Sequence, residues 1–309
     1  MRKRVALWIL VLVLPLFFLG GPGYYSPRSV KAAWDLGHVL FFLPFSWLLC
    51  SFLQTRHPDM RGAALLMRVA MVVLLLGVCI ELLQSQIHGR SMSLADIFRN
   101  LLGTLLAFAF FCPAAGTRQH TRFLLQVSII ILSLLACLPL FISLYDEQVA
   151  RSQFPLLADF ETPFELSRFD GQERVSLSTS IHRHGKRSMR IRLTTETYSG
   201  VTLFYFPRDW QAYARLKFSV YNPNDRMIAL HCRVNDRLHG EHDRAFSDRF
   251  HRRILLKQGW NDLQFTLEDI RQAPASRDMD LSRIELVGIF VAREPAPLTL
   301  YLDWLRLER

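Results

Sequence analysis

Apolar residues are distributed very unevenly along the chain. Between residue 5 and about residue 145, runs of Leu, Phe, Val, Ala and Ile alternate with short polar connections. Each run approaches the roughly 17–25 residues with which a helix crosses a bilayer. The pattern predicts a membrane α-helical bundle of about five transmembrane helices, at residues 5–20, 35–53, 64–84, 94–112 and 123–144.

The first apolar run allows two interpretations. Pro15 interrupts it, and the basic stretch "MRKR" in front of a short apolar core is also typical of a signal peptide. The sequence "FLGGPG" that follows offers no convincing small-residue cleavage site. We therefore expect an uncleaved anchor, with a cleaved signal peptide as the alternative.

In the second half of the chain, apolar and polar residues alternate with a period of two. "MRIRLTT", "RLKFSVY", "IALHCRV", "NDLQFTL" and "LTLYLDWL" alternate apolar and polar residues, and turn signals such as "NPND" and "EPAP" separate them. Many short alternating strands predict an all-β sandwich of the jelly-roll type. We divide the chain into a transmembrane bundle (1–145), a linker (146–156) and a β-sandwich (157–309).

Composition narrows the function only slightly. The 309 residues are 50% hydrophobic with a formal net charge of +10, and both figures average two unlike halves. No long basic run indicates a nucleic-acid partner, and the chain has no Gly-rich phosphate loop, nucleophile elbow or H-E-x-x-H motif. We expect no cofactor and no metal. In the polar stretch 239–253, metal ligation by His239, Glu241, His242 and Asp243 is the weaker alternative to a solvated or ligand-contacting loop.

Positive charges favour one orientation in the membrane. The amino terminus and the second and fourth connections carry Arg2, Lys3, Arg4, Arg56, Arg61, Arg68, Arg118 and Arg122, whereas the first and third connections carry Arg28, Lys31, Arg90 and Arg99. By the positive-inside rule the amino terminus is cytoplasmic and the β-sandwich is periplasmic or extracellular. We expect a multi-pass protein of the inner or plasma membrane, with membrane lipids as partners.

Polar residues gather at the predicted outer ends of three helices. Ionisable groups inside membrane helices cost about 2.5–3.5 kcal/mol each on insertion scales, so they usually face a bundle interior or a cavity. Spacings of three and four residues place each set on one helical face. The candidate pocket consists of Asp35, His38, Glu81, Gln84, Arg90, Asp96 and Asn100.

Structural explanations remain open for most of this set. Ser93 and Asp96 have capping-box spacing, so Asp96 can belong to a helix cap. Gln84 and Asn100 can form packing hydrogen bonds between helices, and the whole set can be an ion-pair network. Glu81 is harder to explain in this way, because a carboxylate in an apolar helix needs a partner or a neutralising proton.

The spacing of these residues resembles that of the VanZ-like membrane family. The stretches "DLGHVLFF" and "IELLQSQIHGRSMSLADIFRNLLG" contain D-x-x-H, E-x-x-Q, an Arg in the turn and D-x-x-x-N-x-x-G, at Asp35, His38, Glu81, Gln84, Arg90, Asp96, Asn100 and Gly103. The resemblance covers about residues 25–115. Leu36 departs from it, because the family more often has lysine there. The resemblance implies a polytopic membrane protein of a family whose founding member is linked to teicoplanin resistance, without an established mechanism.

The second half resembles galactose-binding-like and carbohydrate-binding-module-like β-sandwiches. The resemblance spans about residues 157–309 and depends on the phrases "LADFETP", "HGKRSMRI", "RDWQAYARLKFSVYNP", "QGWNDLQFTLEDI" and "LYLDWLRLE". It implies a saccharide ligand, for which the candidate contacts are Trp210, Tyr213, Tyr198 and Trp260. Trp210, Trp260 and Trp304 lie beside strand starts, so for the tryptophans we favour a place in the core, with stacking on a sugar as the alternative.

Three functions are compatible with these patterns. The favoured one is a membrane protein of the cell envelope that binds an envelope glycan, a lipid-linked saccharide or a glycopeptide, with a role in glycopeptide resistance or envelope maintenance. The second is an intramembrane enzyme for a lipid-linked phosphate-containing substrate, in which Glu81 or His38 is the general acid or base and Arg90 holds the phosphate. The third is a structural assembly protein. The sequence indicates no reaction type.

Overall fold

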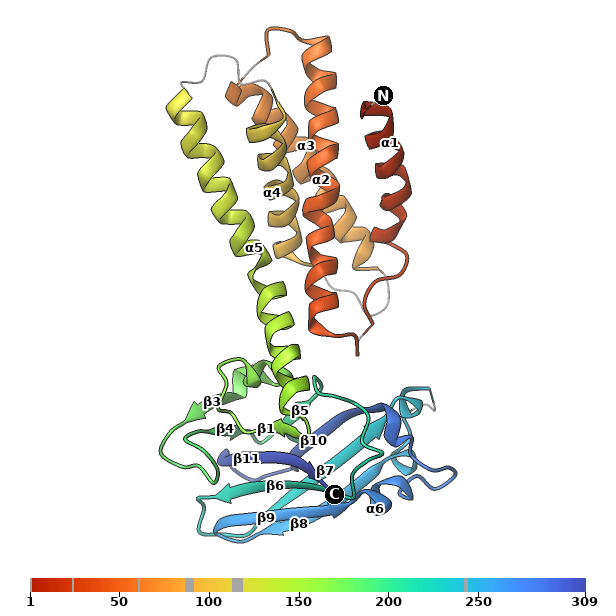
Figure 1. The fold of residues 1–309 in the computed structure, drawn as a ribbon, viewed down its shortest axis with the longest axis vertical. Helices are drawn as coiled ribbons and strands as arrows, with labels where there is room; N and C mark the ends of the chain where they lie inside the picture. Colours follow the sequence, from red (N-terminus) through yellow and green to blue (C-terminus); the bar gives the residue numbers. More distant parts are fainter. Residues whose placement is uncertain (1, 24, 61, 87–91, 113–118, 242–243) are drawn as a thin grey trace. The chain divides into compact units, whose positions relative to one another are not determined.

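The chain folds into two compact units. The computed structural model describes residues 2–309 except 24, 61, 87–91, 113–118 and 242–243. The first unit is Met1–Ser143 and the second is Leu144–Arg309 (Figure 1). The first is helical and the second is built mainly of strands, as the change of period in the sequence predicts.

The five predicted helices are all present in the described residues. They are α1 (Arg2–Val13), α2 (Arg28–Arg56), α3 (Gly62–Gln84), α4 (Leu94–Phe110) and α5 (Gln119–Gln153). By length and composition α2, α3 and α5 could cross a membrane. The other two are shorter: α1 has 12 residues and continues as a 3-10 turn from Leu14 to Phe17, and α4 has 17 residues. At 1.5 Å per residue α4 is about 26 Å long, slightly less than a bilayer core.

Small residues allow the helices α2, α3 and α4 to pack closely. A Cβ atom at Gly103 of α4 would lie 2.8 Å from the carbonyl oxygen of Val39 in α2. Next to this contact, the hydroxyls of Ser46 in α2 and Thr104 in α4 are 2.9 Å apart. Such contacts are typical of membrane helices, where small residues let backbones approach and hydroxyls bond across the interface.

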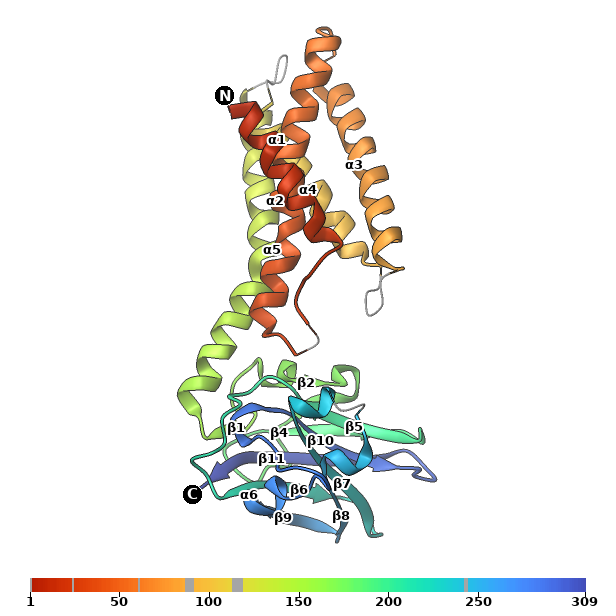
Figure 2. The same cartoon turned by 90° about the vertical axis from the view of Figure 1, so that its right-hand side faces the viewer.

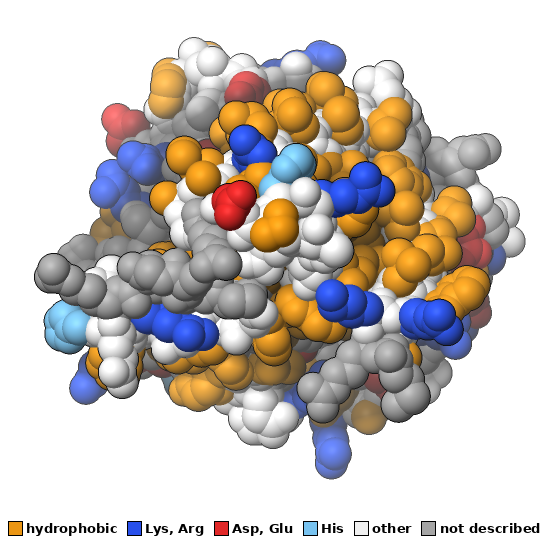
Figure 3. Space-filling view, turned by 90° about the horizontal axis from the view of Figure 1, so that it is seen from above, with side chains coloured by type: hydrophobic (Ala, Val, Ile, Leu, Met, Phe, Trp, Pro, Cys, Tyr) orange, Lys and Arg blue, Asp and Glu red, His pale blue; other side chains and the backbone are white. Residues whose placement is uncertain are grey.

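Basic residues lie at the end of the helical unit where α1 begins, α2 ends and α3 begins. Figure 3 looks onto this end and shows Lys and Arg side chains standing among hydrophobic ones. Lys3, Arg4, Arg56 and Arg68 are exposed here. Figures 1 and 2 show that the starts of α2 and α4 and the end of α3 lie at the opposite end of the unit.

The second unit is a sandwich of two antiparallel sheets, which confirms the predicted fold class. Sheet A has the order β3-β4-β11-β6-β9, with β1 paired to β11, and sheet B has the order β2-β5-β10-β7-β8. The strands of sheet A are β1 (Leu156–Ala158), β3 (Val175–Ser178), β4 (Ser188–Leu193), β6 (Arg215–Asn222), β9 (Gly259–Thr266) and β11 (Leu298–Glu308). Those of sheet B are β2 (Phe169–Asp170), β5 (Tyr198–Leu203), β7 (Ile228–Asp236), β8 (Phe250–Leu256) and β10 (Ile284–Ala292).

The alternating residues of the two sheets meet in one core. In β4, Met189, Ile191 and Leu193 are buried, as the alternation predicts, and they join Leu230 and Val287 of sheet B in the same cluster. Alternate residues therefore face outward on both sheets, and these outer faces are where a ligand could reach side chains.

Residues 146–156, expected to be a linker, instead form the last turns of α5 and the start of β1. A buried ion pair holds this helix end within the second unit. Arg168, which is 0% exposed, donates from Nη2 to Asp146 Oδ1 at 2.9 Å and from Nη1 to the carbonyl oxygen of Leu157 at 2.9 Å. Asp146 is thus part of the β-unit although it lies in a helix that begins in the other unit.

The ion pair between Arg168 and Asp146 indicates where the chain can be cut to give a stable fragment of the second unit. A fragment 157–309 removes Asp146 and leaves the Arg168 guanidinium buried without its carboxylate, which costs about 3–5 kcal/mol. In urea unfolding, we expect the free energy of unfolding of fragment 144–309 to exceed that of fragment 157–309 by about 3–5 kcal/mol. In the shorter fragment, Arg168→Met should recover part of this loss, because it removes the unpaired buried charge. Equal stability of the two fragments would contradict the role given to the pair.

Candidate functional site

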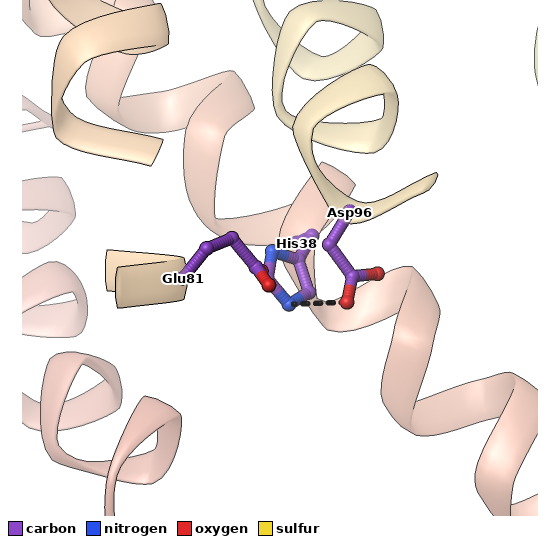
Figure 4. A group of neighbouring side chains, drawn as sticks. All are labelled: His38, Glu81 and Asp96. Carbon is purple, nitrogen blue, oxygen red and sulfur yellow. Dashed lines mark ion pairs between the residues drawn. The ribbon is translucent and has the colours of Figure 1, made fainter. Parts of the chain in front are cut away.

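Three helices place ionisable side chains together at one end of the first unit. His38 comes from α2, Glu81 from the end of α3 and Asp96 from the first turn of α4 (Figure 4). One ligand atom from each lies within 4.8 Å of the others. The sequence predicted these residues at similar depth, and the packing of α4 against α2 at Gly103 brings them into one cluster.

The imidazole of His38 is oriented by an amide. His38 Nδ1 lies 2.8 Å from Asn100 Oδ1 and donates to it, because an amide oxygen only accepts. His38 Nε2 then faces the carboxylates, 3.8 Å from Asp96 Oδ2. The ring of Phe17 covers the imidazole edge-on at 4.9 Å between centroids. Gly77 makes room for the amide, since a Cβ atom there would lie 2.6 Å from Asn100 Nδ2.

The remaining members of the candidate pocket surround this centre. Glu81 is 1% exposed, and its Oε2 accepts from the backbone N–H of Ser93 at 2.7 Å. Gln84 Nε2 donates to the carbonyl oxygen of Phe17 at 2.7 Å. These bonds tie the end of α3 to the turn before α4 and to the segment after α1. Arg90 lies outside the described residues.

Arg99 belongs to the cluster although the sequence analysis did not include it among the candidates. Its guanidinium is 3.2 Å from Asp35 and also pairs with Asp96, three residues earlier on the same helix. The i,i+3 spacing was the available signal. Ser93 caps α4 by accepting from the N–H of Asp96 at 3.3 Å. The predicted cap therefore exists, and it leaves the carboxylate of Asp96 directed to Arg99 and His38.

An apolar cavity of about 190 Å³ adjoins the cluster. Its lining comes from α1, the following 3-10 turn, α2 and α3: Val13, Leu16, Phe17, Ala33, Trp34, Gly37, His38 and Gln84. His38 and Gln84 are its polar members. The combination of an apolar wall and a polar end suits an amphipathic ligand.

A row of rings crosses the outer face of sheet B in the second unit. We use the name ring row for Tyr198 of β5, Phe290 of β10, His231 of β7, His251 of β8 and Phe246, which precedes β8. Successive ring centroids are 5.9, 5.2, 5.0 and 5.0 Å apart. The order β5-β10-β7-β8 brings together residues that are far apart in the sequence.

Glycine makes this arrangement possible at one position. Gly200 lies opposite Phe290 in the β5–β10 ladder. A Cβ atom at Gly200 would be 2.4 Å from Phe290 Cβ and 2.3 Å from the carbonyl oxygen of Ile289. Any side chain here would displace the phenyl ring or the strand.

Three arginines on the same face give the ring row a positive environment. Three arginines lie among the rings: Arg233 of β7, and Arg249 and Arg253, which lie on either side of His251 along the chain. The Cζ atom of Arg249 is 4.7 Å from the centroid of the Phe246 ring. Burial and the neighbouring Arg233 lower the pKa of Arg249. Its Nε is buried and has no hydrogen-bond acceptor among the described residues. Two crowded guanidiniums and an unmatched donor favour an anionic ligand.

A hollow of about 570 Å³ continues from the ring row along the edge of β8. Phe246, Arg249 and His251 line it together with Arg252 and residues of α6 (Leu267–Arg271) and the following loop. Its volume lies within the range of about 300–1,000 Å³ that is common for ligand sites.

The predicted saccharide contacts have very different surroundings. Trp210 is 0% exposed and its Nε1 donates to the carbonyl oxygen of Pro207, so it is a core residue and cannot stack on a ligand. Tyr213 is half-buried and packs on that core. Tyr198 is 67% exposed at one end of the ring row. Trp260 is half-buried on the outer face of sheet A, 5.3 Å from the ring of Tyr221.

The polar stretch 239–253 contains a buried ion-pair network in its described residues. His239 Nδ1 donates to the carbonyl oxygen of Asp248 at 2.9 Å, and Arg277 bridges Asp236 and Asp248. These bonds give His239 a structural role in the second unit. His242 and Asp243 lie outside the described residues.

Residues 6–116 match the family model described as VanZ/LLP1. The match confirms the family resemblance of the first half, and together with the apolar helices it indicates a membrane protein. No curated protein matches the chain.

Solved structures resemble the second half. The family 11 carbohydrate-binding module from Clostridium thermocellum, in complex with a β-1,3-1,4-mixed-linked tetrasaccharide, has 14% identity over 50% of this chain and 94% of its own, with a TM-score of 0.36. An exo-β-agarase has 18% identity over 50% of this chain and 24% of its own, with a TM-score of 0.40. Likeness of this degree assigns no ligand to the present chain.

The ring row predicts a dependence of stability on pH. Burial lowers the pKa of His231 and His251, and the arginines nearby lower both further. The folded unit then binds protons less readily than the unfolded chain, whose histidines titrate near pH 6.5, so stability decreases as the pH falls from about 7 through 6.5. We expect the free energy of unfolding of the 144–309 fragment, measured in urea, to decrease as the pH falls through this range. NMR titration should give pKa values for His231 and His251 below the ordinary value.

His231→Phe is the matched variant for this prediction. It keeps a ring beside Phe290 and removes one titrating group, so its stability should depend less on pH between about 7 and 5. An unchanged slope in the variant, or histidine pKa values at or above the ordinary one, would contradict the assignment.

Proposed function

We propose that this protein is a membrane-anchored binding protein of the cell envelope whose β-sandwich binds an acidic saccharide on the ring row. The observation that carries the proposal is the ring row itself, with Arg233, Arg249 and Arg253 among its rings. Aromatic faces pack against the apolar C–H faces of sugars, and the arginines supply forked donors for carboxylate or phosphate groups.

Two further features support this location. Tyr198 and Phe246, at the two ends of the row, are 67% and 64% exposed, so their faces are accessible. The hollow beside β8 begins at Phe246 and Arg249 and extends the surface beyond the row. A chain of several sugar units could therefore contact rings along the row and place an acidic group at Arg249.

The proposed ligand is a polymer or lipid-linked saccharide of the envelope because of the chain's topology. Lys3, Arg4, Arg56, Arg68 and Arg122 lie at one end of the helical unit. Arg28, Lys31 and Arg99 lie at the other end, where Arg99 pairs with Asp35 and Asp96. The positive-inside rule places the first end in the cytoplasm. Since α5 starts at that end, the chain leaves it for the extracytoplasmic side before the sandwich begins.

The topology is tested by fusions at the carboxy terminus. An alkaline phosphatase fusion should be active and a fluorescent-protein fusion that folds only in the cytoplasm should be dark, because the sandwich follows an odd number of crossings. The reverse pair of results would place the sandwich in the cytoplasm and exclude an envelope saccharide as its ligand.

Binding is tested with the full-length protein in nanodiscs of neutral lipid. Oligosaccharides that carry uronate or phosphate should bind, with an affinity that falls as salt rises, and neutral oligosaccharides of the same length should bind more weakly. Tyr198→Ala should weaken binding roughly 2- to 10-fold and Arg249→Gln roughly 10-fold or more. A glycopeptide and a lipid-linked saccharide are further probes in the same assay.

Trp260→Ala is the control on the opposite sheet. It removes a half-buried ring that also resembles a sugar platform, so it should leave binding unchanged. If Trp260→Ala abolishes binding while Tyr198→Ala and Arg249→Gln do not, the ligand lies on sheet A and the proposed site is wrong.

A further inference from the structure

We propose that His38, Glu81 and Asp96 bind one Zn²⁺ ion at the end of the helical unit. The three side chains come from three helices, and one ligand atom from each lies within 4.8 Å of the others (Figure 4). Zinc takes imidazole nitrogen and carboxylate oxygen at about 2.0–2.2 Å. The two carboxylates would have to move closer to His38 Nε2 to reach that distance from one ion.

The hydrogen bond to Asn100 prepares His38 as a ligand. Because Nδ1 donates to Asn100 Oδ1 at 2.8 Å, the lone pair is on Nε2, and Nε2 faces the carboxylate of Asp96 at 3.8 Å. Metal-binding histidines usually have their second nitrogen held in this way, which fixes the tautomer and the ring orientation. Asn100 is itself 2% exposed and packs against Gly77.

Electrostatics favours a cation at this point. A lone pair on Nε2 and the oxygens of two carboxylates are all acceptors, and 3.8 Å between Nε2 and Asp96 Oδ2 is too long for a hydrogen bond. Both acids lie at the ends of helices in a membrane-type bundle, where negative charge is costly. Asp96 already pairs with Arg99 and Glu81 accepts from the N–H of Ser93, so a divalent cation would bind the remaining carboxylate oxygens together with His38 Nε2.

Three protein ligands leave coordination positions open, as in zinc sites that accept a further ligand. His38 also lines the apolar cavity of about 190 Å³. An amphipathic molecule with a phosphate or carboxylate end could thus place its apolar part in the cavity and its anionic end near the ion. The proposal is independent of saccharide binding by the second unit.

The test uses the full-length protein, purified without a histidine tag, stripped with a chelator and dialysed against Zn²⁺. We expect about one zinc per chain by elemental analysis, and a melting temperature that rises with free Zn²⁺. Glu81→Gln and Asp96→Asn should lose both properties. Asn100→Ala should weaken zinc affinity roughly 10- to 100-fold, because it removes the positioning hydrogen bond and no ligand.

Asp35→Asn is the matched control, because Asp35 pairs with Arg99 in the same cluster but is not one of the three ligands. It should retain the zinc and the thermal response. If the unmodified protein retains no stoichiometric zinc and its melting temperature does not respond, the three residues are only a structural polar cluster and the proposal is wrong. Equal loss of zinc in Asp35→Asn and Asp96→Asn would also overturn it.

Discussion

The cost of removing charge from water governs the structure of both units. A buried charge without a partner destabilises a protein by several kcal/mol, so each such group needs an opposite charge, hydrogen bonds or a ligand. Arg168 meets this requirement with Asp146, and Arg99 meets it with Asp35 and Asp96. The first pair holds the last turns of α5 within the second unit, and Arg99 links α4 to Asp35 of α2 within the first.

The same requirement also applies to the two proposed ligand sites. On sheet B, Arg249 is crowded by Arg233, and its Nε has no acceptor among the described residues. In the helical unit, His38 Nε2 and the carboxylate of Asp96 are acceptors at 3.8 Å without a hydrogen bond between them. The first arrangement favours an anion and the second a cation. The two proposals thus follow from one physical principle applied to opposite charges.

The sequence predicted the fold class and most of the helical cluster, because both depend on how apolar and polar residues repeat over short stretches of the chain. Apolar runs specify the helices, and spacings of three and four specify which faces carry Asp35, His38, Glu81 and Asn100. The end of α5 was missed, because residues 146–153 are polar and their helix is held by Arg168, which lies far along the chain. Arg99 was counted only as a charge and not as part of the cluster.

The ring row could not be predicted in this way. His231, His251 and Phe290 belong to three strands whose adjacency depends on the order β5-β10-β7-β8. The position of Trp210 beside a strand start favours a place in the core, and the structure buries it there completely. Of the four candidate saccharide contacts, Tyr198 is the one that lies in the ring row.

Hydroxyl-radical footprinting of the full-length protein tests the central claim most directly, because it reports on individual side chains on both faces of the sandwich. With an acidic oligosaccharide bound, oxidation of Tyr198 and Phe246 should decrease while that of Trp260 and Tyr221 remains unchanged. Protection of Trp260 and Tyr221 without protection of Tyr198 and Phe246 would contradict the account.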